Sequence, residues 1–400
     1  MSTVRQTEVL PAVGASAPVD RSQRPSTGRL FGVDLARGLA VFGMYAAHVG
    51  PAPNRGGTTG FLMEWTHGRS SALFALLAGF TVVLITGRST PKRGAAGREA
   101  VVKVTIRAAL LVVGGSAVTL TDTPVDVILS FYGVYFLLVL PLYRLGARPL
   151  AWIAAGTAVV FPQVLYVVAH ATGGHGYGSQ VGVDDPFSLL VSGSYPAITW
   201  VPFVIAGMAV ARLELTCATV RVRLALVGVC LAVTGYGGSW LALRTVPGAA
   251  HALIGVAGPG AARAWWSDIA GYPTYDTPAW LLVASPHSQT TLSIIGNTGV
   301  ALAVLATCLI AMDASPRLLA LARPVIAVGS MSLTAYVCHL VAIGLLGIER
   351  VPGSPLRVLF GFVAVAMVLA TAWSRISRRG PLEWLMSRAT DLARYVPVGH

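Results

Sequence analysis

The sequence predicts an all-α, polytopic integral membrane protein of about ten transmembrane helices, with both termini in the cytoplasm. Three observations support this: an apolar composition, a series of long apolar stretches and a one-sided distribution of basic residues. Hydrophobic residues make up 54% of the 400 positions and charged residues only 11%, whereas a soluble domain has about 25% charged residues. Because so few charges cannot cover a soluble surface, most of the exterior must face lipid.

The apolar stretches define the expected spans. About 20 apolar residues cross the hydrocarbon core of a bilayer, and ten stretches approach that length: 31–50, 70–87, 104–121, 125–143, 150–169, 196–211, 224–243, 291–312, 325–347 and 356–374. Residues 1–28 are polar and have no apolar core of a secretory signal. We therefore expect a disordered cytoplasmic tail over 1–28, a transmembrane domain over 29–375 and a cytoplasmic segment over 376–400.

The basic residues orient these spans. Most of the 29 lysines and arginines fall in the two tails and in alternate connections, such as 88–103. Cytoplasmic loops carry this excess in membrane proteins, so the pattern predicts that both termini are inside. The net charge of +13 is thereby explained by topology, and nucleic acid is not expected as a partner; the lipid bilayer is.

The longest connection, 244–290, is expected on the outer side. It contains Trp265, Trp266 and Trp280, which suit either stacking on a sugar or an aromatic belt at the membrane interface. Its apolar run 279–284 is too short to span, so we expect a re-entrant or interfacial segment there.

The first span contains three residues that are unusual in a membrane. Asp34 and Arg37 are three positions apart, so they share one helical face and can pair. An unpaired arginine inside a bilayer costs roughly 2.5–3.5 kcal/mol, and an intramembrane arginine is a functional candidate by default; the alternative is an Arg37 that snorkels to the cytoplasmic surface. His48 ends the same span near the outer face.

Other polar candidates gather near the predicted outer face. His67, Arg69 and Ser70 stand at the mouth of the second span, and His287 and Ser288 precede the eighth. Histidine exchanges protons near neutral pH and can carry an acyl group, so a histidine cluster on one side is a candidate reaction centre. Tyr336 and His339 recur at helical spacing in the ninth span, where helix–helix hydrogen bonding is an equal alternative. The scattered histidines lack the spacing of a metal site, and no metal is expected.

Several motifs resemble a known family. Residues 34–40, Asp34-Leu-Ala-Arg37-Gly38-Leu-Ala, resemble the D-x-x-R-G-x-A opening of the transmembrane acyltransferase superfamily, which includes heparan-alpha-glucosaminide N-acetyltransferase and bacterial YeiB-like proteins. Further similar stretches lie at 67–79, 126–133, 193–207, 285–288 and 379–384. The closing Gly380-Pro-Leu-Glu383-Trp and the Pro-His-Ser loop point to the YeiB-like branch.

The resemblance implies a bacterial plasma-membrane enzyme that transfers an acyl group from cytosolic acyl-CoA, with acetyl-CoA the expected donor, to an extracytoplasmic glycan or lipid. His67 matches the position of the proposed catalytic histidine in the glucosaminide enzyme. His48 falls where related acyltransferases have a histidine. In that scheme Arg69, Ser70 or Asn297 stabilises the oxyanion, and His287 with Ser288 borders the acceptor site.

Two other functional classes remain open at this point. A transporter or flippase would also use an intramembrane Arg37 and His339, and a non-catalytic membrane protein would tolerate replacement of His48 and His67. Incorporation of a labelled acyl group separates the enzyme from both.

Overall fold

The computed structural model describes residues 30–121, 123–173, 187–267 and 275–395; the predicted tail over 1–28 lies outside this part of the chain. The compact unit that begins at Phe31 contains all the elements below. Within the described residues the secondary structure is helical and no strand is present. The all-α expectation is confirmed for this part of the protein.

The chain is a polytopic membrane protein. Six described helical segments are long and apolar enough to cross a membrane: Gly57–Thr86 (α2 with α3), Gly94–Thr119 (α4), Ala147–Ala171 (α6), Ala218–Thr245 (α8 with α9), Thr291–Ala314 (α11) and Leu356–Ser374 (α14). A seventh span arises if Pro316–Ser330 (α12) and Ser332–Leu345 (α13) are counted together. The count of ten and the orientation remain predictions.

The remaining predicted spans also coincide with helices. Phe31–Val49 (α1) includes Asp34, Arg37 and His48, which lower its hydropathy. Two shorter apolar helical segments cover Leu129–Arg144 (α5, Leu129–Val139, with a 3₁₀ turn) and Ala197–Ala211 (α7). Each of the ten predicted stretches therefore overlaps a helix.

Glycines allow the central helices to approach closely. On Arg69–Thr86 (α3), a Cβ at Gly79 would overlap the carbonyl of Val204, and on α7 a Cβ at Gly207 would overlap the carbonyl of Leu76. Helices in membranes pack through such small residues because lipid supplies no hydrophobic drive for association. This contact fixes the backbones of α3 and α7 relative to each other.

One predicted span is broken. We expected a single helix over 325–347, but α12 ends at Ser330, α13 begins at Ser332, and the two helices are bent by 75°. At the break, Pro381–Asp391 (α15) contacts the start of α13: the Glu383 carboxylate accepts hydrogen bonds from the backbone N–H groups of Leu333 (2.8 Å) and Thr334 (3.2 Å) and from the Thr334 hydroxyl (2.6 Å). A carboxylate at a helix N-terminus satisfies free N–H groups and complements the helix dipole. The C-terminal segment thus caps α13.

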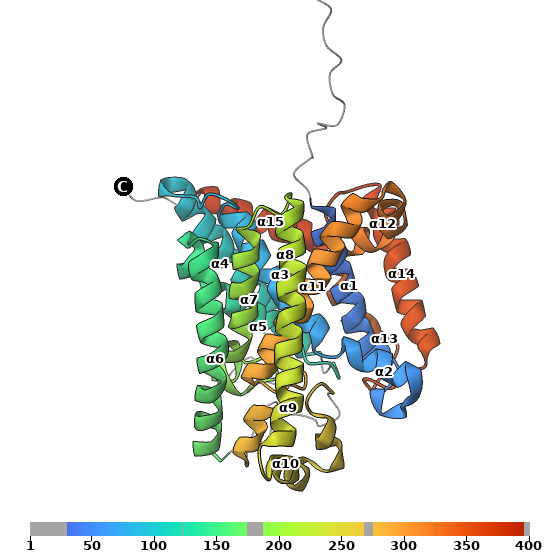
Figure 1. Ribbon diagram of the computed structural model, residues 1–400. Helices are drawn as coiled ribbons and strands as arrows, with labels where there is room; N and C mark the ends of the chain where they lie inside the picture. Colours follow the sequence, from blue (N-terminus) through green and yellow to red (C-terminus); the bar gives the residue numbers. More distant parts are fainter. Residues whose placement is uncertain (1–29, 122, 174–186, 268–274, 396–400) are drawn as a thin grey trace, which may run out of the picture. The chain divides into compact units, whose positions relative to one another are not determined.

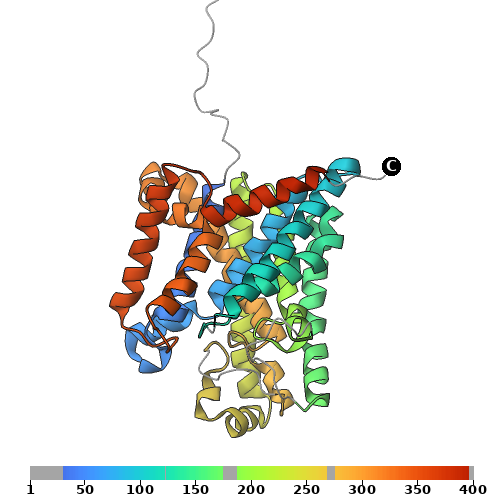
Figure 2. The ribbon, with the colours of Figure 1, turned by 180° about the vertical axis from the view of Figure 1, so that it is seen from behind.

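The two ends of the bundle differ. Figure 1 shows α12 and α15 at one end, and Gly57–Thr66 (α2), Gly238–Thr245 (α9) and Ala249–Ala257 (α10) at the opposite end. In Figure 2, α15 crosses its end of the bundle beside the start of α4.

The described part of the 244–290 connection forms a packed cap. Its core contains Leu243, Leu253, Ala264, Trp280 and Val283. The apolar run 279–284 therefore contributes to a small hydrophobic core of its own.

Candidate functional site

Three of the predicted histidines line one cavity, which we call the histidine cavity. Its volume is about 220 Å³. Its walls come from helix ends and connections, and comprise Ala47, His48, His67, Gly68, Ser71, Pro124, Val125, Asp126, Tyr195, His287, Val351 and Pro352. Since His48, His67 and His287 come from separate segments, the fold assembles the cluster that the sequence predicted on one side.

His48 is held by a hydrogen-bonded chain. Its Nδ1 lies 2.9 Å from Nε2 of His339, and Nδ1 of His339 bonds to the backbone carbonyl of Tyr336. A carbonyl only accepts, so Nδ1 of a neutral His339 carries the proton and its Nε2 accepts. Nδ1 of His48 must then donate, which leaves a lone pair on Nε2 of a neutral His48. The chain sets His48 as a base, with His339 as the orienting group.

His67 lies at the junction of α2 and α3, close to His287. Gly68 follows it with a φ of +64°, and a Cβ there would lie 3.2 Å from Nε2 of His287. Glycine is favoured at positive φ. Gly68 therefore lets the α2–α3 junction approach the His287 ring.

His287 lies in a strained loop. His287 and Gln289 have φ values of +61° and +60°, a region that costs non-glycine residues of order 1–3 kcal/mol. Surrounding hydrogen bonds fix the loop, because the Gln289 amide oxygen accepts from the Thr199 hydroxyl (2.6 Å) and from Nε1 of Trp200 (3.1 Å). In this loop the His287 ring lies against Tyr195, with ring centroids 5.4 Å apart.

Arg69 lies outside the histidine cavity. It is 3% exposed, and its guanidinium donates to the Tyr236 hydroxyl (3.0 Å) and to the carbonyls of Glu64 (2.9 Å) and Trp266 (2.5 Å). Glu64 lies on α2, Tyr236 lies in the turn between α8 and α9, and Trp266 lies in the cap. Arg69 thus connects these three segments and does not line the histidine cavity.

Three other predicted site residues also lie elsewhere. Asn297 accepts from the Tyr236 hydroxyl (2.8 Å), Ser70 donates to the Thr66 carbonyl (2.8 Å), and buried Ser288 shares a hydrogen bond with Thr290 (3.2 Å). Ser71 and Asp126 line the cavity instead. Both belong to stretches of family-like sequence, which was the available signal for them.

A second polar cavity, the arginine cavity, lies within the helices. Its volume is about 320 Å³, and its lining includes Arg37, Thr81, Arg107, Tyr336 and Glu383. The predicted Asp34–Arg37 pair is confirmed at 3.4 Å, and Arg37 also donates to the Thr81 hydroxyl (3.0 Å). Two guanidinium groups beside one cavity suit a phosphate-bearing ligand. Arg107 was missed because the sequence places it among other basic residues at the start of a span.

Three aromatic side chains, which we call the aromatic septum, line the arginine cavity. They are Phe74, Tyr132 and Tyr336, and the Phe74 ring stacks on Tyr132 (centroids 5.5 Å apart) and on Tyr336 (6.5 Å). The Tyr132 hydroxyl donates to the carbonyl of Ser71 (3.4 Å), a residue of the histidine cavity. The septum rings therefore line the arginine cavity, and Tyr132 contacts a residue that lines the histidine cavity.

Within the described residues, no group of three or more His, Cys, Asp or Glu side chains is arranged to hold a metal ion.

Fold and cavities together define a polytopic membrane protein with polar sites buried among its helices. The chain belongs to a YeiB-like family related to heparan-alpha-glucosaminide N-acetyltransferase. Residues 29–234, just over half of the chain, match the family model described as heparan-alpha-glucosaminide N-acetyltransferase, catalytic. Residues 253–393 match DUF418, a family of unknown function. No curated protein matches the chain.

The two matches meet at the site. His48, His67 and both cavity arginines lie in the first, whereas His287, His339 and Glu383 lie in the second. The match to a catalytic domain points to a membrane acyltransferase type of function, and the site contains residues from both parts.

Proposed function

We propose that this protein is an acyltransferase of the bacterial plasma membrane, with ten spans and both termini inside. It would move an acyl group from cytosolic acyl-CoA to an extracytoplasmic glycan or lipid. The observation that carries the proposal is the presence of two polar cavities, one with arginines and one with histidines, which Tyr132 links through its hydrogen bond to Ser71.

The arginine cavity is the proposed donor site. It lies toward α15, the end that carries the basic connections and is predicted to be cytoplasmic. Arg37 and Arg107 would attract the CoA phosphates. The pantetheine arm would extend past Phe74, Tyr132 and Tyr336 and place the thioester at the histidine cavity.

The histidine cavity is the proposed site of transfer. His67 takes the proton from the acceptor hydroxyl or amine, whose oxygen or nitrogen bonds to the thioester carbonyl carbon. The C–S bond breaks, and the CoA thiolate leaves and takes up a proton. His48, whose tautomer is set by His339, serves as the second proton acceptor. The first turn of α3, which reaches the cavity through Gly68 and Ser71, offers the positive end of a helix dipole to the oxyanion.

The first test follows labelled acetyl-CoA with purified protein in detergent and an added membrane extract that supplies glycan and lipid acceptors. Wild type should release CoA, and His67→Ala should not. His251→Ala is the matched control, because His251 is exposed on α10 and lines neither cavity. Label retained on the wild-type protein would indicate an acyl-histidine intermediate in place of direct transfer.

The same assay addresses the transporter alternative. Binding of acyl-CoA without cleavage, across several chain lengths, would contradict the transferase and favour transport through the two cavities. Cleavage that persists in His67→Ala would contradict the role given to His67.

A further inference from the structure

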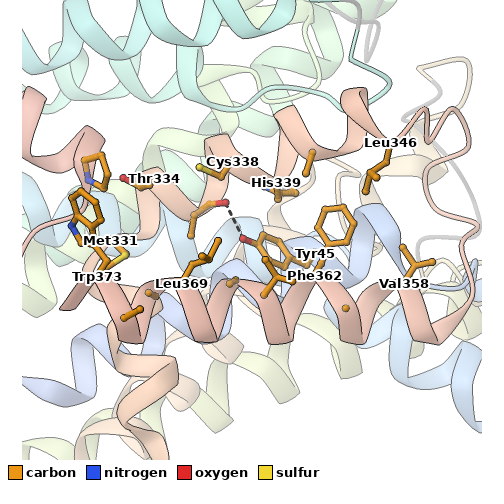
Figure 3. A pocket seen from close by; sticks show the side chains of 18 of the residues that line it. Tyr45, Met331, Thr334, Cys338, His339, Leu346, Val358, Phe362, Leu369 and Trp373 are labelled. Carbon is orange, nitrogen blue, oxygen red and sulfur yellow. Dashed lines mark hydrogen bonds between the residues drawn. The ribbon is translucent and has the colours of Figure 1, made fainter. Parts of the chain in front are cut away.

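An apolar groove of about 670 Å³ lies between α13 and α14. Figure 3 shows Met331 and Trp373 at one end of it, Leu346 and Val358 at the other, and His339 between them. Small residues such as Ala342 and Gly361 widen the groove. Its length along two membrane helices and its apolar walls match a hydrocarbon chain.

The groove opens on the lipid-facing side. Leu346, Val365 and Leu369 line it with 65%, 58% and 63% of their surfaces exposed. In a membrane-spanning segment such exposed apolar residues face lipid, so a lipid chain reaches the groove by moving sideways within the bilayer.

The groove adjoins the histidine cavity at two places. His339 lines the groove and hydrogen-bonds to His48 of the cavity. The 346–355 connection joins the groove's two helices, and its residues Val351 and Pro352 line the cavity. A lipid chain in the groove would therefore bring its head group beside the histidines.

Basic side chains surround that end of the groove. Arg350 is exposed in the connection and Arg357 is exposed in the first turn of α14, and exposed Arg55 donates to the Gly353 carbonyl (3.1 Å). Glu349 is the one acidic residue within 346–357. Three guanidinium groups against one carboxylate favour an anionic head group.

We propose that the α13–α14 groove binds the hydrocarbon chain of an anionic, phosphate-bearing lipid, with its head group at Arg350 and Arg357 beside the histidine cavity. The binding site stands on the geometry alone. The assignment of this lipid as the acyl acceptor rests on the proposed function, and narrows the acceptor to the lipid class.

The test uses purified full-length protein in vesicles and no acyl donor. A phosphatidylglycerol probe with a photoreactive acyl chain is crosslinked, and the modified peptides are mapped by mass spectrometry. Crosslinks within 331–376 should saturate and should be displaced by unlabelled phosphatidylglycerol but not by phosphatidylcholine. Crosslinks on the exposed face of α4 around Val113 should rise with probe concentration without saturation, as expected for bulk lipid.

Two variants sharpen the test. The double variant Arg350→Gln, Arg357→Gln should weaken competition by phosphatidylglycerol by about thirtyfold. Each basic residue near an anionic lipid contributes about 1 kcal/mol of binding free energy, and the loss of two such contributions corresponds to that factor. Gly361→Phe should fill the groove and remove the saturable crosslinks. Gly114→Phe on α4 is the matched control, because an added Cβ meets no atom within 4 Å at either glycine.

Equal, non-saturating crosslinking at both places, or no preference for the anionic lipid, would overturn the lipid site. Failure of the proposed function is a separate result, because lipid crosslinking is measured without an acyl donor. Saturable lipid binding without cleavage would retain the site and contradict only its role as acceptor site.

Discussion

The two polar cavities differ in how they are built. The histidine cavity is formed by helix ends and connections, with His67, His287 and Pro352 outside the centres of helices, whereas Arg37 and Arg107 of the arginine cavity lie within α1 and α4. Fixed charges on rigid helices suit binding, and groups on connections held by a scaffold suit chemistry. In the proposed mechanism the histidine cavity therefore controls the rate of turnover, and the arginine cavity controls the affinity for the acyl donor.

After His67→Ala, the largest expected effect comes from His48→Ala, which removes the second proton acceptor. General-base catalysis contributes about 10²–10⁴-fold, so kcat should fall within that range while KM for acyl-CoA stays nearly constant. Steady-state kinetics over a range of acyl-CoA concentrations measure both values. A rise in KM with unchanged kcat would contradict the assignment of chemistry to this cavity.

Arg107→Gln should show the opposite pattern. Loss of a hydrogen bond to a charged group costs about 1.5–3 kcal/mol, so KM for acyl-CoA should rise by about 10–100-fold with little change in kcat. Arg98→Gln serves as the control, since Arg98 is an exposed arginine of the same helix that lines neither cavity. If both variants behave alike, the arginine cavity is not the donor site.

His339→Leu tests the orienting role at an intermediate magnitude. Without its acceptor, Nδ1 of His48 loses a hydrogen bond, and an unsatisfied buried donor costs about 1–3 kcal/mol. We expect kcat to fall by about tenfold with KM for acyl-CoA retained. His339→Gln, whose amide oxygen can accept the same hydrogen bond, should recover part of the loss; equal loss in both variants would indicate only a packing role.

The smallest effect on stability is expected for His287→Gly. Glycine removes the strain at φ +61° but increases the entropy of the unfolded chain, so the free energy of unfolding should change by less than about 1 kcal/mol. Turnover should still fall, because the imidazole leaves the histidine cavity. Thermal denaturation and the CoA-release assay measure the two quantities on one sample. Unchanged turnover would remove His287 from the site.

Patterns in the sequence were reliable where residue spacing or membrane depth alone decides where a side chain lies. The three-residue spacing of Asp34 and Arg37 predicted their ion pair. The placement of His48, His67 and His287 at span ends on one side predicted their common cavity, because the ends of antiparallel helices meet there.

Features set by distant partners were not predictable. The cap at the start of α13 comes from Glu383, about 50 residues later in the chain. Arg69 was expected beside the reacting groups, but Tyr236 and Trp266 bind its guanidinium from segments far along the chain. Hydropathy places a residue at a depth in the membrane and does not say which neighbour its side chain will contact.

The aromatic septum has an electrical consequence in the proposed topology. In the proposed mechanism, a charge that passes between the two cavities moves past Phe74, Tyr132 and Tyr336, and so through part of the membrane voltage. Moving one elementary charge through the full voltage involves about 2.3 kcal/mol per 100 mV. The free energy of any step that carries a proton or a charged thiolate past these three rings therefore depends on the transmembrane voltage.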